Sequence, residues 1–76
     1  EVSIMAKFNG HRSYNAWNVS LWLNNDENLH NTMLYCIRRS NTRKAAANML
    51  LELLPPKTPD GAPYTVRSVI EAMRGL

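Results

Sequence analysis

The chain has 76 residues, of which 45% are hydrophobic, and a formal net charge of +3 at pH 7. This length accommodates one small domain, and the apolar fraction predicts a globular fold, which excludes a disordered tail. The single cysteine, Cys36, excludes an internal disulfide framework, and no apolar run is long enough for a membrane span. We therefore expect a cytoplasmic protein without a membrane partner.

The beginning of the chain differs in pattern from the rest. Residues 1–12 show no sustained period and contain the turn dipeptide Asn9-Gly10, which predicts a flexible N-terminal segment. A single helical domain is expected over residues 13–76, starting at Ser13, a good N-cap residue.

The first predicted helix, at about residues 13–24, contains both tryptophans. Helical spacing places Tyr14, Trp17 and Leu21 on one apolar face, and we expect Trp17 to be buried in the core. Between this face and a second one, formed by Ala16, Val19 and Leu23, runs a polar and aromatic stripe. Asparagine can read base edges and tryptophan often anchors interfaces, so the stripe is a candidate contact surface, although core packing of its tryptophan is an open alternative. Its members are Asn15, Asn18, Trp22 and Asn25.

Three further helices are predicted, at about residues 26–39, 42–54 and 65–74. Asp26, the polar break from Ser40 to Thr42, and Thr65 supply their N-caps, while Pro55-Pro56 ends the third helix. Residues 55–64 form a loop rich in proline and glycine, and Gly75 follows the last helix. The fold class is therefore all-α, with four short helices. Their expected core residues are Leu29, Met33, Cys36, Ile37, Ala46, Leu50, Leu53, Val66, Val69, Ile70 and Met73.

The sequence contains no recognisable catalytic or cofactor-binding motif. His11 and His30 lie in different elements, and the spacing of His30 and Cys36 does not suit zinc. Cys36 falls on an apolar helix face, where a small core residue is expected. The acidic residues are scattered along the chain. We therefore predict a non-enzyme with no cofactor and no metal.

Basic residues gather around the junction of the second and third predicted helices. With no acid among them, they are expected to contact phosphates or an acidic protein, although an ordinary solvated corner explains them equally well. These residues are Arg38, Arg39, Arg43 and Lys44.

The last two predicted helices and their loop resemble a segment in the DNA-binding region of large serine recombinases. The matching residues are Thr58, Pro59, Gly61, Tyr64, Thr65, Val66 and Arg67, preceded by the helix Ala45–Leu54. The resemblance implies a helix-turn-helix-like unit whose second helix enters a major groove. Thr65, Arg67 and Ser68 would then face DNA, and Lys57 or Arg74 would meet phosphates. The alternative is that the loop only shapes a tight crossover, with Tyr64 in the core.

The chain also resembles, over most of residues 6–74, a family of small uncharacterised proteins encoded by phages and other mobile elements. The residues that carry this resemblance are Asn9, Tyr14, Asn15, Trp17, Asn18, Val19, Leu21, Trp22, Asn25 and Asp26. It implies a binding protein directed at the host or its defences, such as an inhibitor of a nucleic-acid-guided immune complex.

Three functions remain open from the sequence. The first is a non-enzymatic protein that binds a host protein complex and so acts on a nucleic-acid-related process. The second is a regulator that binds nucleic acid, with duplex DNA favoured over RNA. The third is a structural or assembly subunit that self-associates, so that the protein is a monomer or a homodimer.

Overall fold

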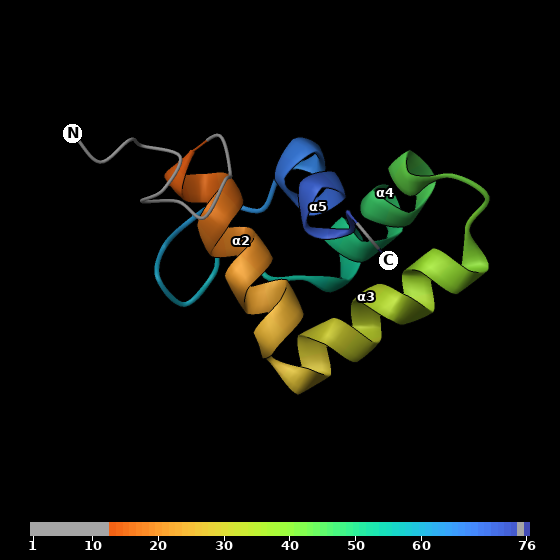
Figure 1. Ribbon diagram of the computed structural model, residues 1–76, viewed down its shortest axis with the longest axis horizontal. Coiled ribbons are helices and arrows are strands. Elements are labelled where there is room, and N and C mark those ends of the chain that lie inside the picture. The colour runs from red at the N-terminus through yellow and green to blue at the C-terminus, as the bar shows by residue number, and fades with distance from the viewer. Residues whose placement is uncertain (1–12, 75) are drawn as a thin grey trace.

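The computed structural model describes residues 13–74 and residue 76. These residues form four helices and no strand, which confirms the all-α prediction. The predicted N-terminal segment 1–12 and Gly75 lie outside the described residues. The last helix ends at Ala72, two residues earlier than expected. Figure 1 shows the helices α2 (Tyr14–Asn25), α3 (Glu27–Arg39), α4 (Arg43–Leu53) and α5 (Val66–Ala72).

Each helix begins at a residue whose side chain accepts a hydrogen bond from a backbone N–H three positions further along the chain. Such a cap satisfies one of the N–H groups that the first turn of a helix leaves without an intrahelical partner. At α5 the bond is reciprocal, because the side chain of Ser68 accepts from the backbone N–H of Thr65. The four caps are Ser13, Asp26, Thr42 and Thr65; the sequence predicts three of them by residue, and Thr42 only as part of the polar break from Ser40 to Thr42.

The helices pack in a closed cycle. Helix α2 contacts α3 and α5, and α4 also contacts α3 and α5, whereas α2 does not contact α4. In Figure 1, α3 runs along the lower edge of the molecule and α5 lies between α2 and α4. In this order α3 and α5 each pack against α2 and α4, and α3 also has a long outer side against which no other described helix packs.

The core lies inside this cycle, and the loop between α4 and α5 contributes to it. Ala62 and Tyr64 of that loop are buried together with side chains from all four helices. Burial of Tyr64 raises the pKa of its hydroxyl, and the negative charge of Asp26 raises it further. The buried residues contributed by the helices are Val19, Leu23, Met33, Cys36, Ala46, Ala47, Leu50, Val69, Ala72 and Met73.

Two predictions about the core are wrong. Trp17 is only half-buried and lies outside the buried cluster, where its ring packs against Tyr14 with centroids 5.7 Å apart. Leu53 is 56% exposed, whereas Ala47 of the same helix, which was not expected in the core, is buried. Helical periodicity identifies apolar faces, but the positions of the neighbouring helices decide which face is covered.

Candidate binding surfaces

The loop between α4 and α5 is folded on itself as a tight turn. Thr58 and Ala62 exchange two contacts: the Thr58 N–H donates to the Ala62 carbonyl at 2.8 Å, and the Ala62 N–H donates to the Thr58 hydroxyl at 3.1 Å. Pro59 occupies the second turn position, which suits its fixed φ, and Gly61 has a φ of +92°, which glycine adopts without strain. The outer residues Lys57 and Pro63 form an isolated antiparallel bridge.

This turn is fastened to α2 by a polar cluster that we call the loop clamp, formed by Asn18, Trp22, Thr58 and Asp60. The Asn18 amide donates to an Asp60 carboxylate oxygen at 2.8 Å, and the Trp22 indole N–H donates to the same oxygen at 3.0 Å. The Thr58 hydroxyl donates to the Asn18 side-chain oxygen at 2.6 Å. Asn18 is 1% exposed, so its side chain connects the loop to α2 and is not accessible to a binding partner.

Two of the four residues of the predicted contact stripe belong to the loop clamp and bond to the loop. Asn18 and Trp22 face the loop through their polar atoms, whereas Asn15 and Asn25 are exposed. Asn15 lines a hollow where α2 begins, and Asn25 lines another beside Trp22, with volumes of about 260 and 250 Å³. The structure therefore separates these four residues into a pair with a structural role, the buried Asn18 and the half-buried Trp22, and two exposed asparagines.

Acidification is expected to weaken the loop clamp. The bonds from Asn18 and then Trp22 stabilise the carboxylate and hold the pKa of Asp60 below its ordinary value of 3.8. Because the folded-state pKa is the lower one, the contribution of Asp60 is present in full above about pH 4 and is lost as the pH falls through the folded value.

Urea denaturation across a pH series measures this loss. Asp60→Asn is the matched control, because it retains the shape of the side chain and cannot titrate. We expect the stability difference between the wild type and Asp60→Asn to shrink as the pH falls below about 4. A difference that stays constant over the acid range contradicts the assignment.

The four residues of the predicted basic cluster do not all have the same role in the structure. The Arg43 guanidinium donates to the backbone carbonyls of Met73, at 3.3 Å, and of Leu76. The Asn24 amide of α2 donates to the carbonyl of Ala72 at 3.3 Å. Side chains from α4 and α2 thus satisfy carbonyls at the end of α5, which have no partner within that helix. All four cations are exposed, but only Arg43 has such a bond among the described residues and so has a structural role, whereas Arg38, Arg39 and Lys44 have none.

Helix α5 does not present all the residues that a groove-reading helix was expected to present. Arg67 is exposed, but Ser68 is 4% exposed and its hydroxyl donates to the Thr65 carbonyl at 3.1 Å. The prediction that Ser68 faces DNA is therefore wrong. Lys57 is exposed on the loop. The structure confirms the alternative interpretation of Tyr64, which is buried in the core.

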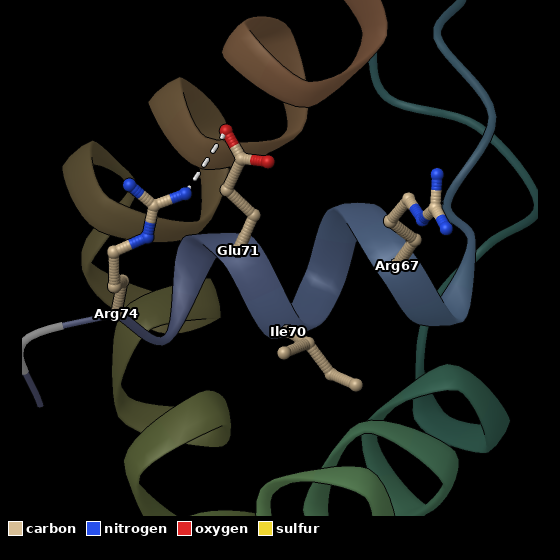
Figure 2. A pocket seen from close by; sticks show the side chains of 4 residues that line it. All are labelled: Arg67, Ile70, Glu71 and Arg74. Atoms are coloured by element: carbon tan, nitrogen blue, oxygen red, sulfur yellow. Dashed lines mark ion pairs between the residues drawn. The ribbon is translucent and has the colours of Figure 1, made fainter. Parts of the chain in front are cut away.

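The outward side of α5 forms a surface hollow of about 340 Å³, which we call the α5 hollow. Figure 2 shows Arg67 near the start of α5 and Arg74 just after its end. Glu71 is directed toward Arg74, and Ile70 is directed to the other side of the helix. The guanidinium of Arg74 lies 3.6 Å from the Glu71 carboxylate. Arg67 and Glu71 also line the hollow at the start of α2, so the two hollows adjoin.

The possible metal ligands and the cysteine can be located within the described residues. The described residues contain no group of three or more His, Cys, Asp or Glu side chains suited to a metal ion. Cys36 is buried, and burial raises the pKa of its thiol, which makes a thiolate nucleophile less accessible. None of the described helices has both the length and the hydrophobicity to cross a membrane.

Two side chains that matter here were missed at the level of sequence. Asp60 stands in an Asp-Gly turn signal, which indicates a loop but not a partner 42 positions away on α2. Tyr35 is 48% exposed in the middle of α3, with the Arg39 guanidinium 4.9 Å from the centre of its ring. The spacing of Tyr35 and Arg39, four residues apart on one helix, is the only local signal for this contact.

The fold and its surfaces define a small all-α domain made of four helices and a clamped loop. The chain belongs to a family of unknown function, DUF7249, whose model matches residues 4–73. Neither the curated proteins nor the solved structures that were searched gave a match.

Proposed function

We propose that the chain is a small, non-enzymatic binding protein of phage or mobile-element type. In this proposal it acts in the host cytoplasm by occupying a host protein complex that handles nucleic acids. The α5 hollow is the observation that carries the proposal, since it joins a second hollow across α2 and α5 through Arg67 and Glu71.

The chemistry of the α5 hollow favours a protein partner over a phosphate backbone. Arg74 is paired with Glu71, so Arg67 is the exposed cation of this surface that has no ion-pair partner among the described residues. Binding to a phosphate backbone depends on several neutralised phosphates, which one such cation does not supply. A protein surface can complement both arginines, and arginine is enriched at protein interfaces.

The position of α5 in the fold also favours a protein partner over DNA. This helix has seven residues and is held between α2 and α4, and Ser68, in its first turn, faces inward. A recognition helix must project far enough to reach base edges in a groove. A partner that docks over α5 and the start of α2 needs no such projection.

Charge reversal at Arg67 tests the proposal. We expect the tagged wild type to retain a defined set of proteins from a nuclease-treated host-cell lysate, and Arg67→Glu to lose that set by about 10-fold or more, as is common for a central arginine of an interface. Lys57→Glu is the matched control, because Lys57 is equally exposed but lies outside both hollows. It should retain the set.

Three results would overturn the proposal. One is a captured set that disappears with nuclease treatment, which indicates a nucleic-acid partner. Another is equal loss in Arg67→Glu and Lys57→Glu, which indicates non-specific charge attraction. The last is the absence of any set retained by the wild type. Circular dichroism of each variant confirms that the helices are intact.

A further inference from the structure

The outer face of α3 is a separate surface with a chemistry of its own, and we call it the α3 face. Its exposed residues follow the spacing of one side of a helix, and no other described helix covers them. Amide side chains occupy its first half, a tyrosine its middle and two arginines its last turn. These residues are Asn28, Asn31, Tyr35, Arg38 and Arg39, and the exposed acid Glu27 lies on the same side in the first turn.

The formal charges have one sign over a long stretch of the sequence that includes most of α3. Glu27 and Glu52 are the nearest acids, and every formally charged residue between them is an arginine or a lysine. Arg43 is engaged with carbonyls beyond the end of α5, so Arg38, Arg39 and Lys44 are the cations left at this corner. Three neighbouring cations without an acid produce a local positive potential that attracts a polyanion.

The middle of the α3 face contains a contact between two of its side chains. The Arg39 guanidinium lies 4.9 Å from the centre of the Tyr35 ring, a geometry in which the cation is attracted to the aromatic face. This contact holds both side chains on the outer side of α3. A surface with side chains already positioned loses less conformational entropy on binding.

We propose that α3 is a duplex-DNA-binding helix that inserts its outer face into the major groove. A major groove of about 12 Å admits an α-helix, and asparagine amides can form paired hydrogen bonds with adenine there. Arg38, Arg39 and Lys44 contact phosphates at the groove edge, and Asn31 and Tyr35 face the bases. Glu27 lies in the first turn of α3, at the opposite end of the helix from the two arginines.

Duplex DNA fits this face better than the other polyanions. Single strands are bound mainly in grooves that follow the backbone, whereas the α3 face is the outside of one rigid helix. The major groove of duplex RNA is too narrow for side chains to read. The α3 face is distinct from the α5 hollow, so it adds a nucleic-acid contact to the protein contact proposed above.

Fluorescence anisotropy with a labelled DNA duplex of mixed sequence, over a salt series, tests the proposal. Each phosphate contact contributes about 0.9 to the slope of log affinity against log salt. The triple variant Arg38→Ala, Arg39→Ala, Lys44→Ala is therefore expected to lower that slope by about two to three and the affinity by roughly 10- to 100-fold. The triple Lys57→Ala, Arg67→Ala, Arg74→Ala removes the same charge elsewhere and should retain both values.

Two further measurements separate groove insertion from simple charge attraction. Tyr35→Ala should lower the affinity while leaving the salt slope unchanged, because the tyrosine carries no charge. Methyl green, which occupies the major groove, should displace the protein, and netropsin, which occupies the minor groove, should not.

Several outcomes would overturn the proposal. They are absence of duplex binding at low salt, equal losses in the two triple variants, and tighter binding of single-stranded DNA or duplex RNA than of duplex DNA. Competition by polyglutamate as effective as that by DNA would assign the face to an acidic protein. All of these results leave the capture experiment on Arg67 unaffected, so failure here is distinguishable from failure of the proposed function.

Discussion

Replacing Leu50 with alanine is expected to destabilise the domain by about 2–5 kcal/mol, which is the largest effect we foresee for a single substitution. Leu50 is completely buried at the centre of α4, and truncation leaves a cavity among tightly packed side chains. A domain of this size has a free energy of unfolding of only about 5 kcal/mol or somewhat more, so the substitution should remove a large part of the stability and lower the unfolding temperature by about 10 °C or more.

Leu53→Ala is the matched control for this substitution. It removes the same atoms from the same helix, but Leu53 is 56% exposed, so the change in the free energy of unfolding should stay within about 0.5 kcal/mol. Thermal unfolding followed by circular dichroism compares the two variants directly. Similar shifts in both would contradict the way α4 is placed against the core.

Asn18→Ala is expected to destabilise the domain by about 2–3 kcal/mol. The substitution removes the acceptor for the Thr58 hydroxyl, which is buried, and one donor to the Asp60 carboxylate. A buried hydroxyl without its partner loses more free energy than a typical net hydrogen bond contributes. Urea denaturation measures the change in the free energy of unfolding.

A second readout reports on the loop itself. Without Asn18 the turn loses its main attachment to α2, so we expect trypsin to cut after Lys57 faster than in the wild type, under conditions where both proteins are folded. Asn25→Ala, an exposed asparagine on the same helix, should change neither the stability beyond about 0.5 kcal/mol nor the cleavage rate. Unchanged cleavage in Asn18→Ala would contradict the clamp.

Local chemistry made the helices predictable from sequence. The caps Ser13, Asp26 and Thr65 depend on residues within one turn, and the prolines after α4 end that helix by removing N–H donors. These effects do not require knowledge of the tertiary fold. For the same reason, the four helices and the long loop were expected close to their observed positions.

The errors occurred where long-range contacts decide the outcome. Asn18 was assigned to a contact stripe because its polarity was visible and its partner Asp60, on the distant loop, was not. Arg43 was placed in a basic cluster because its charge was visible, whereas its contact with the end of α5 depends on how α4 and α5 pack. A polar residue on a helix is ambiguous until the neighbouring element is placed, since either a protein group or a partner can satisfy it.

The outward-facing surfaces could be located only with the fold in hand. The sequence identified Arg67 and Arg74 as candidate contact residues. That they line one hollow together with Ile70 and Glu71 depends on the position of α5 between α2 and α4. Tyr35 has the spacing of an outward residue on α3, yet nothing in its own segment distinguishes an exposed tyrosine from a buried one.

The most direct test of the central claim, that the α5 hollow binds a host protein, is photo-crosslinking in the host cell. A photoreactive amino acid placed at position 67 should form a protein–protein adduct that survives nuclease treatment. The same probe at position 57, on the exposed loop outside the hollow, should form none. Equal adducts from both positions, or an adduct at position 67 that contains nucleic acid instead of protein, would contradict the account.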